Sequence, residues 1–173
     1  MKILALHVDH IAFEAQKKAL KDALDEEKRS DKVGESLVIL TCFEKHDESN
    51  TSGIVNLLVK NIDELAAKVK EKTIVLYPYA HLSSNLGNPS LAYQVLLDTE
   101  KSLRKKGFKV IRAPFGYYKS LDLSVKGHPL SELSRSFSIE DVQTLHLKRE
   151  AKEELFSLNS KKLESQEKLH LTT

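Results

Sequence analysis

The sequence predicts an α/β (α+β) domain in which helices pack on a mixed β-sheet. The 173 residues fit one ordinary domain with a tail, and an apolar fraction of 40% is enough for a sizeable core. Strand-like and helix-like segments alternate along most of the chain. Two strand-like segments then follow each other directly across residues 113–116, which favours a mixed sheet over a purely parallel one.

The first two predicted strands flank a polar segment. Residues 2–8 (KILALHV) are almost continuously apolar, as is typical of a strand that is buried on both faces. Residues 11–32 are polar and helix-prone, so we expect either a helix or a long exposed connection there. Residues 36–43 (SLVILTCF) predict the second strand, because they are rich in β-branched and aromatic side chains.

Two helices and a third strand are predicted next. Residues 73–79 (TIVLYPY) predict the strand, and residues 88–107 predict a helix after it. Asn88 suits the N-cap of that helix, Pro89 its first position and Gly107 its C-terminal cap. The helix before the strand is indicated by apolar residues at spacings of three and four, which share one helix face: Val55, Leu58, Ile62, Leu65 and Val69.

The last part of the domain reads as two more strands and a tail. Residues 108–114 predict a fourth strand and residues 117–125 a fifth, with a hairpin or a sharp bend at Gly116. The chain then becomes charged and helix-prone without a sustained apolar stripe. We therefore expect one domain over residues 1–140 and a charged helical tail or linker over residues 141–173.

Composition excludes several classes of protein. A net charge of +2 excludes a strongly basic nucleic-acid coat. The single cysteine, Cys42, excludes an intrachain disulfide and a cysteine-rich zinc site, and it suits a cytoplasmic setting. No apolar run approaches the ~18 residues of a membrane span. No glycine-rich phosphate loop is present, and His7 and His10 around Asp9 form only a weak metal pattern, so we expect no metal and no cofactor.

Three titratable residues lie beside irregular backbone, where functional sites collect. His81 directly follows the strand 73–79, and it serves either a site or the strand end. Glu132 lies near the start of a possible turn or short helix, and is either a site residue or a solvated carboxylate favoured by the helix dipole. Lys119 shares a predicted strand face with apolar neighbours, namely Tyr117, Leu121, Leu123 and Val125.

An inward lysine is costly, because desolvation disfavours its charged form. Lys119 therefore either stabilises a developing oxyanion or holds a carboxylate or phosphate, or else lies at the rim of the sheet and extends to water.

Three stretches together resemble the N-terminal editing domain of archaeal threonyl-tRNA synthetases. They are YPYAHLSSNLGNPSLA (77–92), GFKVIRAPFGYYKS (107–120) and KGHPLSELSR (126–135). Residues 1–19 are similar to the first strand and helix of the same family. The resemblance covers roughly residues 1–138 and leaves out the tail, which in that family leads toward the synthetase body.

The resemblance implies a fold similar to D-aminoacyl-tRNA deacylases, a homodimer and a hydrolytic activity. That activity is editing of L-seryl-tRNA(Thr), with release of serine and free tRNA(Thr), while threonyl-tRNA(Thr) is spared. The partners implied are the 3′ end of tRNA(Thr) carrying L-serine and the remainder of the synthetase, with no membrane and no cofactor in this domain.

The resemblance also implies the site residues. The catalytic positions are Lys119, His81 and Glu132. The positions that bind substrate are Tyr118, Pro78, Tyr79, Ala80, Phe115 and Phe43. Two residues depart from the family's pattern, since Phe43 replaces a commonly smaller aliphatic residue and His10 a common tyrosine.

Two other functions remain open from the sequence. One is a freestanding D-aminoacyl-tRNA deacylase on the same fold. The other is a non-catalytic tRNA-binding or dimerisation module that uses a basic face near a helix end, formed by Lys101, Arg104, Lys105 and Lys106.

Overall fold

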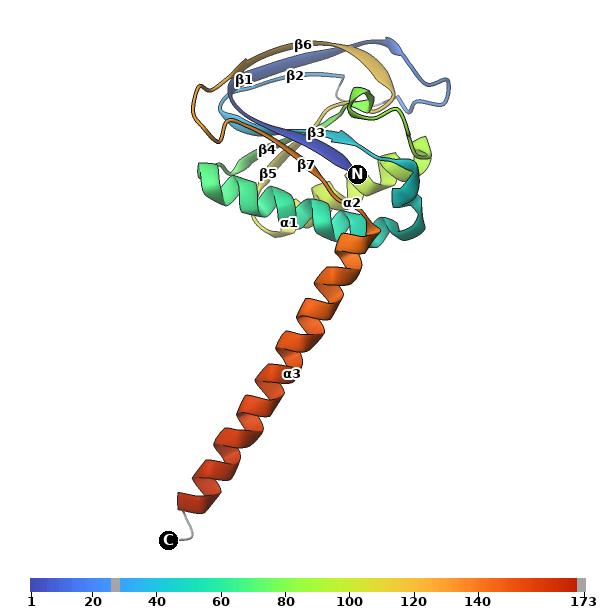
Figure 1. Cartoon of the computed structure of the whole chain (residues 1–173). Coiled ribbons are helices and arrows are strands. Elements are labelled where there is room, and N and C mark those ends of the chain that lie inside the picture. The colour runs from blue at the N-terminus through green and yellow to red at the C-terminus, as the bar shows by residue number, and fades with distance from the viewer. Residues whose placement is uncertain (26–28, 171–173) are drawn as a thin grey trace. The chain divides into compact units, whose positions relative to one another are not determined.

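A computed structural model describes residues 1–25 and 29–170 of the chain, without the side chains of residues 145 and 161–170 (Figure 1). The chain divides into two compact units, Met1–Ile139 and Glu140–Thr173.

A mixed β-sheet forms the centre of the first unit, and it has seven strands in the described part of the chain. The strands are β1 (Lys2–Lys18), β2 (Ser30–Val33), β3 (Ser36–Cys42), β4 (Thr73–Pro78), β5 (Lys109–Arg112), β6 (Tyr117–Val125) and β7 (Glu132–Ser136). The order is β2-β1-β3-β4-β5, and β6 and β7 also pair with β1. β3, β4 and β5 are parallel, whereas β1 is antiparallel to β2, β3, β6 and β7. The predicted mixed sheet is therefore confirmed.

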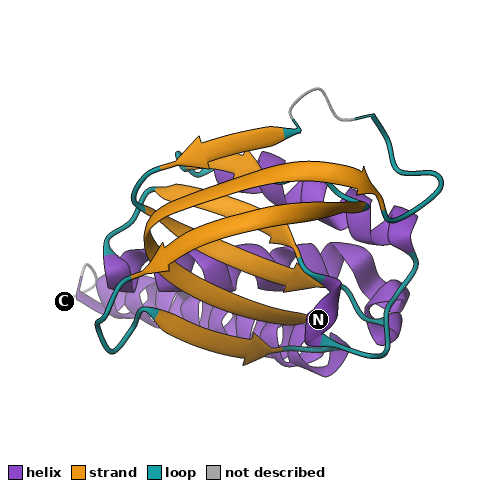
Figure 2. Ribbon diagram, turned by 90° about the horizontal axis from the view of Figure 1, so that it is seen from above, coloured by secondary structure: helices purple, strands orange, loops and turns teal. Residues whose placement is uncertain are grey.

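Both faces of the central strands are covered. The helices α1 (Thr51–Val69) and α2 (Pro89–Lys105) lie on one face of the sheet, as Figures 1 and 2 show. On the other face, Val38 and Val75 of the central strands pack in one core cluster with Val8 and Phe13 of β1. This is why every residue of β3 is buried and why its sequence is mainly apolar.

β1 corrects one expectation, because it continues to Lys18 where a helix or an exposed connection was expected. Ile11 and Phe13 are buried while Glu14 is exposed, which is the alternation of a strand. Ile11 pairs with Val33 of β2 on one side and with Leu123 of β6 on the other. Two flanking ladders therefore override the helix propensity of the Ala, Glu, Gln and Lys residues in this segment.

Both predicted helices are confirmed, and the caps predicted for the second of them are confirmed as well. The Asn50 side chain accepts a hydrogen bond from the Gly53 N–H at the start of α1. Asn88 accepts from the N–H groups of Ser90 and Leu91 at the start of α2, where Pro89 takes the first position. Gly107 follows the end of α2 with φ of +90°, a conformation that glycine adopts without strain.

The bend at Gly116 agrees with one of the two expected alternatives, whereas the turn expected at Glu132 is not found. β5 and β6 form no hairpin, because β5 pairs with β4 and β6 with β1, and the chain bends sharply at Gly116 with φ of +77°. Glu132 starts strand β7 and not a turn or a helix, because residues 132–136 pair along β1 from Leu6 to Lys2. Two short 3₁₀ helices, η1 (Lys45–Asn50) and η2 (Ala80–Leu82), follow β3 and β4.

The second unit is helical. It contains nearly all of α3 (Ile139–His170), whose described side chains include several large exposed apolar ones, such as Leu147, Leu155 and Phe156. Among the described residues, no helix is long and apolar enough to cross a membrane.

Candidate active site

A cavity of about 430 Å³ lies where β3 and β4 end. Its wall includes Thr41, Cys42 and Phe43 from the end of β3, and residues 77–81 from β4 and η2. Residues 115–119, at the bend and the start of β6, complete the wall together with Ala19, Leu20, Leu86, Gly87, Pro89 and Ala92. The carboxyl ends of parallel strands are the usual place for a ligand in an open sheet.

The fold brings eight of the nine predicted site residues together. The cavity is lined by Lys119, His81, Tyr118, Pro78, Tyr79, Ala80, Phe115 and Phe43. Glu132 does not line it, since this exposed residue starts β7 opposite Leu6 of β1. The catalytic role of Glu132 stays a prediction.

Lys119 supplies the positive charge of the cavity. Its Nζ donates hydrogen bonds to the carbonyl oxygens of Pro114 and Tyr117, each at 3.0 Å, and lies 5.0 Å from the centre of the Tyr77 ring. An ammonium group has three N–H donors, so a third remains for a ligand. Burial lowers the pKa of Lys119 to about 8, because desolvation disfavours the charged form. At neutral pH the ammonium form still predominates.

Aromatic side chains line much of the cavity. Tyr77 is buried, and burial, with a smaller contribution from Tyr79, raises its pKa to about 12, so the phenol stays neutral. The His81 ring is exposed and packs edge-on against Tyr79, with 5.2 Å between centroids. Tyr118 is 57% exposed, and Lys17 Nζ lies 5.6 Å from the centre of its ring. His81 and Tyr118 therefore belong to the open side of the cavity.

The β3 side of the cavity is closely packed. Phe43 is buried, and a Cβ atom built on Gly87 would lie only 2.6 Å from Phe43 Cδ1 and 2.8 Å from the Glu44 carbonyl oxygen. The Cys42 thiol donates to the Ala80 carbonyl oxygen at 3.7 Å, and burial is the main cause that raises its pKa. Cys42 thus stays a neutral, apolar part of the wall and not a nucleophile.

Several lining residues escaped the sequence prediction. Thr41 and Tyr77 face the cavity because β3 and β4 pair in parallel, with the Tyr79 N–H donating to the Thr41 carbonyl oxygen at 2.8 Å. Gly87 carried one signal, since a glycine directly before a helix N-cap often marks a close approach of backbone. The result is a mainly apolar cavity with one held ammonium group, suited to a small polar group that develops negative charge.

Solved structures show the same fold. The chain aligns with the structure described as c-Myc DNA Unwinding Element Binding Protein with a TM-score of 0.57, over 79% of this chain and 99% of that one. The sequence identity is 11%, so this likeness concerns the fold alone. The predicted fold class, a mixed β-sheet with helices packed on it, is confirmed.

Sequence comparisons lead to archaeal synthetases. The chain is 46% identical over 142 residues to the threonine–tRNA ligase of Methanobrevibacter smithii, and 41% identical over 160 residues to that of Thermococcus kodakarensis. These matches cover 82% and 88% of this chain but 23% and 26% of the ligases, so the chain spans about a quarter of the length of these relatives. The model of the archaea-specific editing domain of threonyl-tRNA synthetase matches residues 1–137. The chain therefore belongs to the family of archaea-specific editing domains of threonyl-tRNA synthetase.

Proposed function

We propose that this protein hydrolyses L-seryl-tRNA(Thr) to serine and free tRNA(Thr) and spares threonyl-tRNA(Thr). The observation that carries the proposal is the Lys119 ammonium group, which two backbone carbonyl oxygens hold in an apolar cavity of an editing-family chain. The same fixed donor serves deacylation in general, and the choice of serine is the finer part of the proposal.

The chemistry asks little of the protein, because an aminoacyl ester is already activated. A water molecule attacks the ester carbonyl carbon, the bond from that carbon to the ribose oxygen breaks, and the ribose oxygen takes up a proton. A fixed N–H donor that meets the developing oxyanion lowers this barrier. In this proposal the third N–H of Lys119 is that donor.

The residues at the open side position the substrate. His81 and Tyr118 present rings on which the terminal nucleotide of the tRNA can rest, while the aminoacyl group enters between Pro78, Ala80 and Phe115. Glu132 lies outside this lining, and its catalytic role stays a prediction.

Selectivity for serine follows from space. Threonine carries one methyl group more, and a single methyl gives roughly 1–3 kcal/mol of discrimination at a synthetic site, which is too little for faithful decoding. A separate hydrolytic site that rejects threonine by a steric clash supplies the remaining discrimination between serine and threonine. Phe43 is buried and lies in close contact with Gly87, so it has little room to move aside for an extra methyl group. This supports such a clash.

We further propose that hydrolysis requires no metal. The cavity lining includes no group of three metal-ligating side chains among the described residues, as both such groups lie elsewhere. We expect the rate of serine release to survive exhaustive chelation. Loss of activity that zinc restores would contradict this part of the proposal.

The partners follow from the family. We propose that the domain meets the 3′ end of tRNA(Thr) in the cytoplasm, as a homodimer and as part of a threonyl-tRNA synthetase. The alternative basic face is partly neutralised within the fold, because Arg104 pairs with Glu100 and Lys106 with Asp63, both at 2.9 Å.

A deacylation assay decides between the candidate functions. The protein is incubated with tRNA(Thr) carrying L-serine, L-threonine or a D-amino acid, and release of each amino acid is followed over the uncatalysed rate. We expect release of L-serine only. Preference for the D-amino acid would indicate the freestanding deacylase, and no release from any ester would indicate a non-catalytic module.

A further inference from the structure

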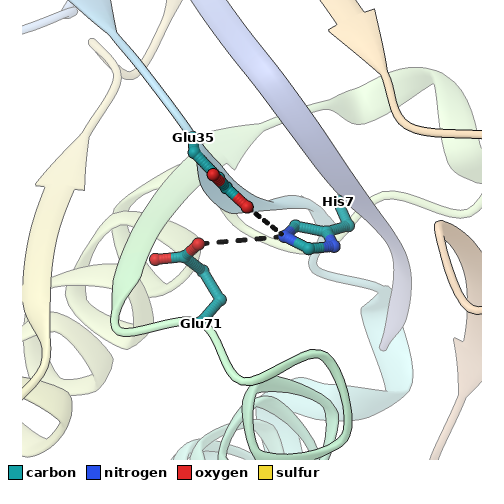
Figure 3. A group of neighbouring side chains, drawn as sticks. All are labelled: His7, Glu35 and Glu71. Carbon is teal, nitrogen blue, oxygen red and sulfur yellow. Dashed lines mark ion pairs between the residues drawn. The ribbon is translucent and has the colours of Figure 1, made fainter.

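A second cluster of titratable groups lies at the opposite end of the central strands from the cavity. His7 of β1 pairs with Leu37 of β3, Glu35 directly precedes β3, and Glu71 lies in the turn before β4. Figure 3 shows the two carboxylates pointing toward the same ring nitrogen. His7 Nε2 lies 3.6 Å from Glu35 Oε1 and 3.8 Å from Glu71 Oε2.

The Nε2 atom of His7 has no hydrogen-bond partner among the described residues. His7 is only 6% exposed, and within the described part of the chain its Nε2 is a buried side-chain atom without a hydrogen bond. Both carboxylate oxygens lie beyond hydrogen-bond distance. A buried polar atom without a partner is rare in folded proteins and requires an explanation.

The carboxylate of Glu71 is fixed in place by backbone. Its Oε1 accepts hydrogen bonds from the N–H groups of Lys72 and Thr73, each at 2.8 Å. Its side chain is 13% exposed, and the other oxygen faces His7. The side chain of Glu35 is 60% exposed, and Lys126 Nζ lies 3.3 Å from it. One ligand is therefore rigid, and the other can adjust.

We propose that His7, Glu35 and Glu71 bind a divalent transition-metal ion of the zinc class. In a tetrahedral site with bonds of about 2.0–2.2 Å, neighbouring ligand atoms lie roughly 3.3–3.6 Å apart. The observed separations from Nε2 are near this range, and the three ligand atoms lie within 4.8 Å of one another. One imidazole nitrogen with two carboxylates favours Zn²⁺ or Co²⁺ over Mg²⁺ and Ca²⁺, which prefer oxygen ligands. Water completes the coordination on the exposed side of Glu35.

A second histidine sets the proton positions on His7. His7 Nδ1 lies 2.8 Å from His128 Nε2, and the Leu130 N–H donates to His128 Nδ1 at 3.2 Å. When both rings are neutral, this series of hydrogen bonds places the proton of His128 on its Nε2. It places the proton of His7 on the Nε2 that faces the carboxylates. A metal ion at Nε2 displaces that proton, and each ring then carries its proton on Nδ1. His7 donates to His128, and the exposed Leu130 N–H turns to water.

Lys126 competes with the metal ion. Its ammonium group hydrogen-bonds Asp9 and pairs with Glu35, and the Asp9 bond is the first cause that raises the pKa of Lys126. Removing this charge frees Glu35 for the metal. If the three side chains form a metal site, removal of Lys126 should increase the affinity for the metal. If they only pack against one another, removal of Lys126 would loosen these contacts and would not increase that affinity.

The site is separate from the cavity. Leu37 beside His7 and Thr41 in the cavity wall are four positions apart on β3, a distance of about 13 Å at about 3.3 Å per residue. The ligands come from β1, from the turn before β3 and from the turn before β4, so a bound ion would tie these three segments together.

A different group of side chains, the Glu44 cluster, supplies an internal comparison. Glu44, His46 and Asp47 also come close enough to hold a metal. Their carboxylates already face a cation, because the Met1 amino group lies 2.8 Å from Asp47 and 3.2 Å from Glu44. We therefore expect the His7 cluster to bind metal and the Glu44 cluster not to.

Calorimetric titration of the full chelator-treated chain with Zn²⁺ tests the proposal. We expect one tight site per chain that prefers Zn²⁺ to Mg²⁺. Glu71→Gln keeps the shape of the side chain and should weaken zinc affinity by at least about 100-fold, more than the 10–100-fold typical of an outer-shell change. Glu35→Gln should weaken it by at least about tenfold, and Lys126→Met should strengthen it.

Matched controls separate this site from incidental binding. Asp122→Asn alters an exposed histidine–carboxylate pair, in which Asp122 lies 3.5 Å from His10. His46→Ala alters the Glu44 cluster. Both should leave zinc affinity unchanged. Ring ¹⁵N shifts of His7 and His128 should report the move of both protons when zinc binds. No tight zinc binding, or binding that Glu35→Gln and Glu71→Gln leave intact in folded protein, would overturn the proposal.

Discussion

At the scale of single residues, the position of Lys119 makes its ammonium group testable by one substitution. Lys119→Met keeps the stem and removes the charge. Loss of one preorganised donor costs roughly 10²–10³ in turnover, so we expect kcat for serine release to fall by about that factor. KM should change less, since an interaction made mainly in the transition state appears in kcat.

The matched control for this substitution is Lys60→Met, because Lys60 is an exposed residue on α1 that pairs with Glu64 at 3.8 Å. It should keep the parent rate. A folded Lys119→Met protein that hydrolyses at the parent rate would make Lys119 a structural residue of the cavity wall.

The lowered pKa of Lys119 predicts two pH effects of opposite sign. Catalysis that needs the ammonium form should fall as pH rises through about 8, the pKa in the folded protein. Stability should rise from that pH up to the ordinary lysine value of 10.5, because there the unfolded chain binds more protons than the folded one.

Both pH effects should disappear in Lys119→Met. The measurements are serine release, corrected for uncatalysed hydrolysis, and urea unfolding across the same pH range. A wild-type rate that stays level from about pH 7 to 9.5 would show that the titrating ammonium is not the active group.

At the scale of elements, the segment between η2 and α2 supports the cavity through Gly87. Gly87→Ala places a methyl group against the Phe43 ring and the Glu44 carbonyl oxygen, so Phe43 must shift. We expect a loss of about 1–3 kcal/mol in the free energy of unfolding, as is typical of overpacking, together with a raised KM for the seryl ester.

Gly127→Ala is the control for this effect, because a Cβ atom on Gly127 would meet nothing within 4 Å. Thermal melts and steady-state kinetics on both variants separate the local clash from a general effect of replacing glycine. Equal behaviour of the two variants would contradict the proposed role of Gly87.

The elements also show what the sequence can and cannot predict. Helix α1 was predictable from its apolar spacing and helix α2 from its caps, because both are local signals. The second half of β1 was not, because its pairing with β2 and β6 depends on segments far along the chain. The same reason hides the cluster of His7, Glu35 and Glu71, whose members meet only after β1, β3 and β4 are aligned.

The candidate site was predictable to a similar degree. Lys119, His81 and their neighbours in the motifs line one cavity, as the resemblance implied. Thr41 and Cys42 join them through the parallel pairing of β3 with β4, which leaves no local motif, and Gly87 joins them through a close contact before α2. Glu132 lies on β7, outside the lining, because its strand extends along β1.

At the scale of the whole molecule, all residues that line the cavity fall between positions 19 and 119, within the first unit. We therefore expect a chain ending at Ile139 to release serine at the rate of the full chain. Circular dichroism and gel filtration check that the shortened protein is folded. A folded fragment without activity would show that the second unit takes part in hydrolysis.

The pairing of β1 with several other strands has a consequence for synthesis on the ribosome. Among the strands of the first unit β1 is made first, and it pairs with β6 and β7, which are made last. Until residues 132–136 emerge, one edge of β1 carries open hydrogen-bonding groups, and such edges attract other chains. The sheet must therefore close late, through contacts between distant parts of the chain, which makes folding slow and leaves incomplete chains prone to aggregation.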